Sequence, residues 1–301
     1  MTDKQNPQSV KDRLYNCARL SKRPYQDILT MYVLERVLYR LSISEYRDHF
    51  ILKGGVLLYG LYRSEFPRAT TDIDFLARRI SNKAENIKET FSEILSIETD
   101  DPLVFDVEGI KVTSITEMKQ YHGIRVSATA FLERSRIKVS IDIGFGDSIY
   151  PERTEIEYPT LLGGDSPKLF AYSLYSVIAE KFHAIVSLGE INSRYKDFYD
   201  IALIASTNDL DGETLLQSVK ETFQNRVEGC DDIKAFEKPF TENKERQMRW
   251  EGFLKTKDVS SHPSFVETME ILKKLLMPIA ESIRRNTGFH LSWDHKNLEW
   301  Q

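Results

Sequence analysis

Two aspartates, Asp72 and Asp74, stand two residues apart in the segment TTDIDFL (70–76), whose polar and apolar residues alternate as in a strand. Successive strand side chains point to opposite faces, so both carboxylates are expected on one face. Two like charges this close are costly without a cation, and hard divalent ions such as Mg²⁺ prefer oxygen ligands. A DxD pair alone is weak evidence, because most such pairs lie in turns or on solvated strand faces. The pair predicts a metal site only if its surroundings support one.

A glycine turn precedes the acidic pair by a short distance. The apolar run FIL (50–52) is followed by Lys53-Gly54-Gly55 and then by the apolar segment 56–62, a pattern that predicts a strand, a turn and a helix. Glycines let the backbone approach a phosphate closely, and a helix N-terminus presents free N–H groups to an anion. A plain tight turn explains the glycines equally well when they are considered alone.

A third carboxylate, Asp142, interrupts the otherwise apolar strand pattern KVSIDI (138–143). Charged residues are rarely buried unless they are paired or bind a metal. If this strand lies beside that of Asp72 and Asp74, three carboxylates converge and can hold two metal ions about 3.5–4 Å apart for in-line phosphoryl transfer. Asp142 is then the natural base for an attacking hydroxyl. Asp147, which follows two glycines, is expected to be a turn residue.

A second group of charged residues falls in a predicted helical region. Lys181 lies close to an apolar helix stripe, and Asp197 and Asp200 are three residues apart on one helix face. A surface set of salt bridges explains these residues on their own. The alternative is that Lys181 reaches a triphosphate while Asp200 orients it. Arg194 and Lys196 would then add positive charge nearby.

The elements that must position these residues form two parts. Residues 8–47 and 82–96 have helical periodicity, and 103–145 alternate as strands of one sheet. The proline- and glycine-containing segment 150–167 is interpreted as a linker. Helical patterns follow over 169–205, 213–225 and 264–285, and the polar segment 237–262 is expected to be a long connection. The pattern predicts an α+β protein: a mixed-sheet domain with N-terminal helices (1–150) and a mainly helical domain that completes the active-site cleft (151–301).

Composition limits how the chain could bind a polyanion. Its 301 residues contain 41 Lys and Arg against 46 Asp and Glu, a net charge of −5. That excludes a histone-like binder that holds nucleic acid by bulk positive charge. Residues 8–47 carry eight basic and four acidic residues, so this segment and Arg194 are the expected RNA-facing surface.

Other features favour a cytoplasmic enzyme without a membrane segment. The first residues lack the apolar stretch of a signal peptide, and no apolar run approaches the roughly 20 residues of a membrane span. Two cysteines, 213 positions apart (230 − 17), supply neither a disulfide framework nor a cysteine zinc site. The six histidines have no metal-ligand spacing; His183 is expected on a helix surface or at a domain interface. The three tryptophans are expected to pack.

The combined motifs resemble the polymerase β-like nucleotidyltransferase superfamily and, more narrowly, the AbiEii/AbiGii abortive-infection toxins. The resemblance extends from about residue 9 to about residue 226. It is carried by Lys53-Gly54-Gly55, Arg68-x-Thr70-x-Asp72-Ile73-Asp74, the segment DIGFGD (142–147), Ala179-Glu180-Lys181, and Asn192-Ser193-Arg194-x-Lys196-Asp197-Phe198-Tyr199-Asp200.

The resemblance implies a polymerase β-like fold and a toxin of a type IV toxin–antitoxin system that transfers NMP from an NTP. RNA is the implied acceptor, specifically the 3′ end of tRNA, and the antitoxin is a separately encoded chain. Mg²⁺ or Mn²⁺ would bind Asp72, Asp74 and Asp142, which with Lys181 and Asp200 form the implied catalytic set. The implied nucleotide-binding residues are Lys53, Gly54, Gly55, Arg68, Thr70, Lys181, Arg194 and Asp197. Two alternatives remain open: a nucleotidyltransferase that modifies a protein or small molecule, and an NTP-binding regulator that does not turn over.

Overall fold

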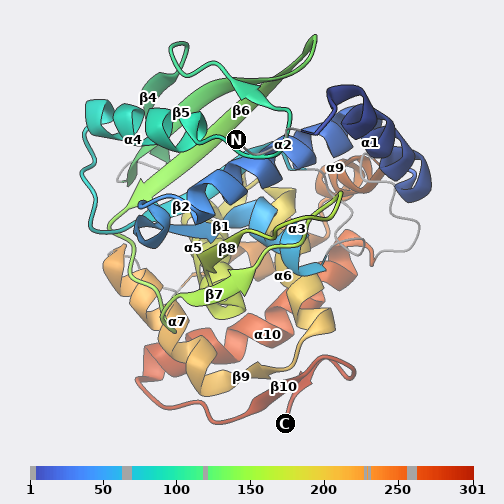
Figure 1. Ribbon diagram of the computed structural model, residues 1–301. Coiled ribbons are helices and arrows are strands. Elements are labelled where there is room, and N and C mark those ends of the chain that lie inside the picture. Colours follow the sequence, from blue (N-terminus) through green and yellow to red (C-terminus); the bar gives the residue numbers. More distant parts are fainter. Residues whose placement is uncertain (1–4, 63–69, 118–120, 227–228, 230–231, 256–262) are drawn as a thin grey trace. The chain divides into compact units, whose positions relative to one another are not determined.

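A computed structural model gives the fold of the chain and describes residues 5–301 apart from 63–69, 118–120, 227–228, 230–231 and 256–262. The chain divides into two compact units (Figure 1). The first comprises residues 1–146 and 154–171, and the second comprises 147–153 and 172–301. Each unit is described below by itself.

The first unit is built on a mixed eight-stranded sheet with helices packed against it. Its elements are α1 (Pro7–Ser21), α2 (Tyr25–Ser42), η1 (Arg47–His49), β1 (Phe50–Lys53), α3 (Gly54–Tyr62), β2 (Asp72–Ala77), α4 (Ala84–Ser96), β3 (Val104–Phe105), β4 (Lys111–Glu117), β5 (Tyr121–Leu132), β6 (Ser135–Phe145), β7 (Thr154–Glu157) and β8 (Lys168–Ala171).

The sheet order is β3-β5-β6-β2-β1-β8-β7, with β4 paired to the other side of the β5 ladder. The pairs β2–β6 and β1–β8 are parallel, and the remaining pairs are antiparallel. This topology places β2 between β1 and β6, so the strand that carries the DxD pair is central. The expected mixed α+β architecture is confirmed.

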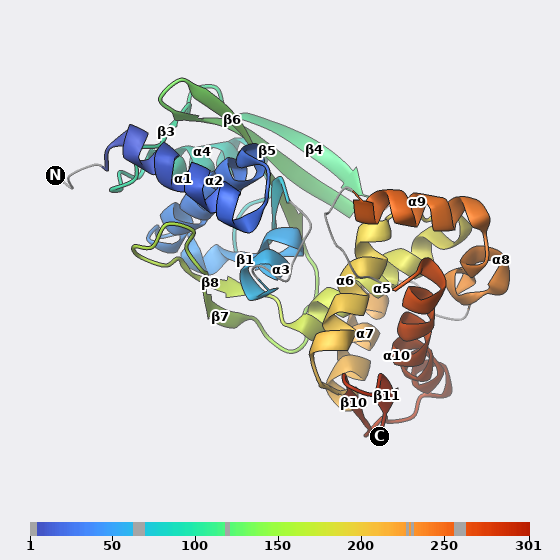
Figure 2. The same cartoon turned by 90° about the vertical axis from the view of Figure 1, so that its right-hand side faces the viewer.

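Period-two burial explains why β6 is a strand with one face in the core. Ile137, Val139, Ile141 and Ile143 are each at most 2% exposed, while Lys138 between them is exposed. Helices cover the sheet by the same principle with a longer period. In α4 the apolar side chains at 87, 91, 94 and 95 are all buried, as the periodicity predicted, and α4 packs on β4 and β5. α2 packs on α1 and α4 and over β6 and β8 (Figures 1 and 2).

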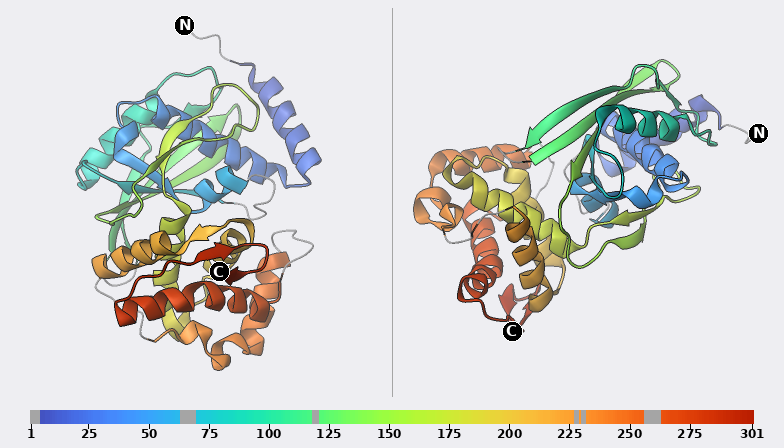
Figure 3. Two further views of the ribbon diagram at one scale, coloured as in Figure 1. Left: turned by 90° about the horizontal axis from the view of Figure 1, so that it is seen from below. Right: turned by 90° about the vertical axis from the view of Figure 1, so that its left-hand side faces the viewer.

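The second unit is mainly helical. Its elements are α5 (Leu174–Leu188), η3 (Gly189–Ile191), α6 (Tyr195–Thr207), β9 (Leu210–Asp211), α7 (Gly212–Asn225), η4 (Lys234–Phe236), α8 (Lys238–Thr241), α9 (Lys244–Lys255), α10 (Phe265–Arg285), β10 (Ser292–Asp294) and β11 (Glu299–Trp300). The β10–β11 hairpin lies beside β9 in a small three-stranded sheet (Figure 3). A capping box between Ser264 and Glu267 begins α10.

Three sequence-based expectations about elements are wrong. The segment 237–262 is not a plain connection, because it contains α8 and α9; only 256–262 lie outside the described residues. Trp250 explains α9: it is 2% exposed, and its ring centroid lies 5.7 Å from that of Phe265. One large side chain anchors this polar helix without an apolar period. The interpreted linker 150–167 contains β7, and residues 169–171 form strand β8 rather than a helix.

Among the described residues, no helix combines the length and apolar character that a membrane span requires.

Candidate active site in a mixed-sheet unit

Three of the predicted metal ligands meet on one face of the first unit's sheet. β2 and β6 are parallel neighbours in a register that sets Asp74 beside Asp142 and Asp72 beside Ser140. One carboxylate oxygen from each of Asp72, Asp74 and Asp142 lies within 4.8 Å of the others. Ile73, between the first two, is fully buried on the opposite face. We call these three side chains the acidic trio; their spacing fits the oxygen ligands of a divalent ion.

The glycine turn is pressed against the trio. β1 and β2 are antiparallel and pair Lys53 with Asp74, so the turn after Lys53 reaches the DxD strand. Gly54 has φ +71°, and a Cβ built there would lie 2.6 Å from Asp74 Cγ. Both the backbone conformation and the space therefore require glycine at this position. α3 begins at Gly54, so its free N–H groups start next to the trio.

Thr70 lies directly before the DxD strand and contacts it. The Thr70 side chain is buried, and its hydroxyl can donate to the Asp72 backbone oxygen at 3.3 Å or to Asp72 Oδ1 at 3.4 Å. These long bonds place Thr70 as a support for Asp72. Arg68, the other predicted residue of this segment, lies outside the described residues.

Sequence reasoning missed Arg125, which pairs with the third carboxylate. β5 and β6 are antiparallel, and their register sets Arg125 opposite Asp142. Arg125 Nε donates to Asp142 Oδ1 at 2.7 Å and Nη2 donates to Oδ2 at 2.6 Å, a bidentate pair. These bonds, together with the charges of Asp142, Asp72 and Asp74, raise the pKa of Arg125 above its usual range, so the guanidinium is always charged. Only the strand register reveals this partner.

The second predicted cluster is an ion-pair network inside the helical unit. Lys181 Nζ on α5 lies 2.8 Å from Asp197 Oδ1 and 2.8 Å from Asp200 Oδ2 on α6. Arg194 Nε lies 2.7 Å from Asp197 Oδ2. Both aspartates are fully buried, which contradicts the interpretation as a surface salt-bridge set. Two cations balance two buried anions, as burial of charge requires.

Thus the predicted site residues fall into two groups. The acidic trio, the glycine turn and Thr70 belong to the first unit, and the Lys181 network belongs to the second. Within each unit the structure brings the predicted residues together.

A further buried network in the second unit surrounds Arg226. Its Nη2 lies 3.2 Å from Asp147 Oδ1 and 3.3 Å from Glu180 Oε1. Asp147 is therefore a buried ion-pair partner and not simply a turn residue. His183, expected at a surface or interface, is 5% exposed, and burial together with the Arg226 charge lowers its pKa to about 4. These residues hold the helices of this unit together.

The expected basic RNA-facing segment is partly internal. Arg36 and Arg40 on α2 are 5% and 3% exposed. Arg40 Nη1 donates to Asp101 Oδ2 at 2.7 Å, and Arg36 Nη2 lies 3.1 Å from Glu35 Oε1. The local positive charge in the sequence therefore overstates the positive charge at the surface, because these two guanidinium groups are neutralised in the core.

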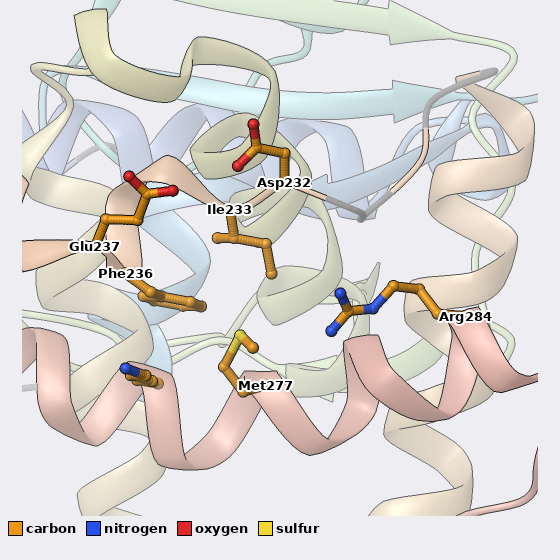
Figure 4. A pocket seen from close by; sticks show the side chains of 7 residues that line it. Asp232, Ile233, Phe236, Glu237, Met277 and Arg284 are labelled. Carbon is orange, nitrogen blue, oxygen red and sulfur yellow. The ribbon is translucent and has the colours of Figure 1, made fainter.

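Two cavities in the described structure lie away from the predicted site residues. One of about 440 Å³ in the first unit is lined by α1, α2, Tyr59 of α3 and residues 158–161. The other, of about 240 Å³, lies in the second unit between η4 and α10 (Figure 4). Its labelled lining residues are Asp232, Ile233, Phe236, Glu237, Met277 and Arg284. Neither cavity contains a member of the acidic trio or the Lys181 network.

A mixed sheet that carries a glycine turn, a DxD strand and a parallel carboxylate strand defines the class of protein as a nucleotidyltransferase. Comparison with known families makes the assignment specific. The model of the nucleotidyl transferase AbiEii toxin of type IV toxin–antitoxin systems matches residues 36–270, so the chain belongs to this family. The resemblance and the enzymatic class expected from the motifs are confirmed.

Solved structures add two similarities at low identity, both from Helicobacter pylori. A candidate nucleotidyltransferase is 14% identical, with a TM-score of 0.47 over 87% of this chain and 98% of that one. The protein JHP933 is also 14% identical, with a TM-score of 0.46 over 86% of this chain and 94% of that one. No curated protein matches the chain. The family assignment rests on the sequence match.

Proposed function

We propose that this nucleotidyltransferase transfers NMP from an NTP to RNA in a Mg²⁺-dependent reaction, and that the acceptor is the 3′ end of tRNA. The observation that carries the metal-dependent part is the convergence of Asp72, Asp74 and Asp142 within 4.8 Å on one face of a sheet. The acceptor follows from the resemblance to toxins that act on tRNA. The antitoxin of the system would be a separately encoded chain.

The acidic trio fits a divalent ion by charge and by donor type. Asp72 and Asp74 present two half-buried carboxylates on one strand face, and oxygen donors of this kind suit Mg²⁺ or Mn²⁺. A bound ion would supply charge compensation for the triphosphate and for the developing charge on the transferred phosphorus. Thr70 would keep Asp72 in its ligating orientation through its hydroxyl.

Asp142 is placed to act on the attacking group. The RNA hydroxyl oxygen forms a bond to the α-phosphorus of the NTP, the bond from that phosphorus to the leaving oxygen breaks, and pyrophosphate departs. The hydroxyl proton passes to Asp142. Arg125 keeps this carboxylate in one orientation through two hydrogen bonds, which leaves further lone pairs for a proton.

The glycine turn and the Lys181 network are the proposed phosphate contacts. The first N–H groups of α3 after Lys53 would bind phosphate oxygens where Gly54 keeps side-chain atoms out of the way. Lys181 would contact the triphosphate while Asp197 and Asp200 hold its ammonium group in place. Arg194, 35% exposed at its side chain, would add positive charge beside them.

The test is incubation of each labelled NTP with total tRNA and Mg²⁺, using the wild type and Asp74→Asn. We expect label in tRNA with the wild type only, mapped to the 3′ end by nuclease digestion. Transfer to protein or to a small molecule but not to any RNA would overturn the RNA acceptor. Absence of pyrophosphate release with RNA, protein and small-molecule acceptors alike would overturn the enzymatic proposal and leave an NTP-binding regulator.

A further inference from the structure

Arg125 is a cation that the fold itself brings to the acidic trio. We propose that Arg125 is a positioning residue that reserves Asp142. A first divalent ion then binds through Asp72 and Asp74, and a second reaches Asp142 only when the guanidinium releases it. This inference rests on the proposed metal-dependent function.

The pair occupies the third carboxylate completely in the resting chain. Arg125 and Asp142 face each other across the β5–β6 ladder, so the backbone register, rather than chance contact, holds them together. Nε and Nη2 take one carboxylate oxygen each, at 2.7 and 2.6 Å. A metal ion that used Asp142 as a bridging ligand would have to share or replace these bonds, because both oxygens already face the guanidinium.

Charge balance favours one ion while Arg125 stays in place. The trio carries three negative charges and Arg125 carries one positive charge, which leaves −2, the amount that one divalent ion neutralises. A second divalent ion would then meet a site already balanced and a guanidinium of like charge close by. Removal of the guanidinium charge should therefore strengthen ion binding at Asp142.

Exposure indicates which partner can move. The Arg125 side chain is 44% exposed, whereas the Asp142 side chain is 12% exposed. A guanidinium at this exposure can be hydrated when it leaves the pair, and ion pairs with an exposed partner are weak. Asp142 is fixed within a strand that has core residues on both sides of it in the sequence, Ile141 and Ile143, both fully buried. The arginine is thus the movable member.

The experiment is a Mn²⁺ titration of the full chain without nucleotide, in which electron paramagnetic resonance measures free Mn²⁺. Asp72→Asn/Asp74→Asn measures binding elsewhere, including at Asp209, Asp294 and His295, the other described group with metal-ligand spacing. After this subtraction we expect one ion per wild-type chain. Arg125→Gln should bind a second ion, or bind the first on the order of tenfold more tightly.

Matched variants separate this role from a structural one. Arg136→Gln removes the same charge from an exposed position on β6 and should leave binding unchanged. Asp142→Asn combined with Arg125→Gln should abolish the gain. Arg125→Lys keeps the charge but loses the fork and should lie between wild type and Arg125→Gln; it replaces Arg125→Gln if that variant does not fold.

The outcomes distinguish the two proposals. No wild-type Mn²⁺ binding above Asp72→Asn/Asp74→Asn overturns the metal-dependent function itself. Wild-type binding that Arg125→Gln, folded by circular dichroism, leaves unchanged or weakens overturns only the role of Arg125. An equal gain in Arg136→Gln would mean that general charge, and not reservation of Asp142, controls the affinity, and would also overturn it.

Discussion

Arg125 on β5 and Asp142 on β6 form a bidentate ion pair at 2.6 and 2.7 Å inside a site whose other side chains are acidic. The pair explains how Asp72, Asp74 and Asp142 remain close together in the chain on its own. Like charges at such distances repel unless a cation is near, and the fold supplies one from the neighbouring strand. The same pair sets the starting point for every metal-binding prediction made for this site.

Asp74→Asn should reduce NMP transfer by on the order of 10²-fold or more, because it removes a charged ligand from the centre of the trio. Initial rates of label incorporation measure the effect. Asp12→Asn, which changes an exposed α1 residue of the same unit in the same way, should keep wild-type activity. Transfer by Asp74→Asn at the wild-type rate would show that this carboxylate is not a ligand.

Gly54→Ala should lose both stability and Mn²⁺ binding. The new Cβ would overlap the Asp74 carboxylate, and φ +71° is strained for alanine by about 1–2 kcal/mol. Gly163→Ala is the control for strain alone, because φ there is +77° and no atom lies within 4 Å of its built Cβ. Thermal unfolding should show a shift in both variants, and a Mn²⁺ titration should show a defect only in Gly54→Ala. Equal Mn²⁺ affinity in the two would contradict the steric argument.

Lys181→Met should destabilise the second unit by about 3–5 kcal/mol, because it leaves Asp197 and Asp200 buried with one cation fewer. All three tryptophans belong to this unit. Urea unfolding followed by tryptophan fluorescence therefore reports on it directly. Lys196→Met alters an exposed lysine of α6 and should change the free energy of unfolding by less than about 0.5 kcal/mol. A similar small effect in Lys181→Met would mean that the aspartates do not depend on this ammonium group.

Glu35 should make the first unit less stable as pH rises. Burial raises the pKa of its carboxyl from 4.5 to about 7, although Arg36 and the Leu161 N–H oppose the shift. The folded state then binds the proton more tightly than the unfolded state. The stabilisation is complete below about pH 4.5 and is lost as pH rises toward 7, by about 3 kcal/mol at most.

Glu35→Gln tests this pH dependence because the amide oxygen can still accept from Leu161 N, which now donates to Glu35 at 2.7 Å. Hydrogen exchange in α2 between pH 5 and 8, corrected for intrinsic rates, measures its local stability. The wild type should lose protection relative to Glu35→Gln as pH rises. Parallel pH profiles for the two proteins would refute the assignment.

Much of the first unit could be predicted because burial follows simple periods. β6 alternates and α4 repeats every three to four residues, and both were found at nearly the correct bounds. α9 could not be predicted in this way, because Trp250 anchors it through contacts with Phe265 and Tyr195 from other helices. Such contacts leave no period in the local sequence.

The candidate site divides along the same line. The sequence by itself determined which residues could do chemistry, because DxD spacing places two carboxylates on one strand face and adjacent glycines permit close backbone approach. Only the tertiary structure decided their neighbours. Strand register set Asp142 beside Asp74 and Arg125 opposite Asp142, and helix packing buried Asp197 and Asp200 against Lys181. The physical reason is that local spacing orients a side chain relative to its own element, whereas pairing between strands and packing between helices join residues distant in the chain.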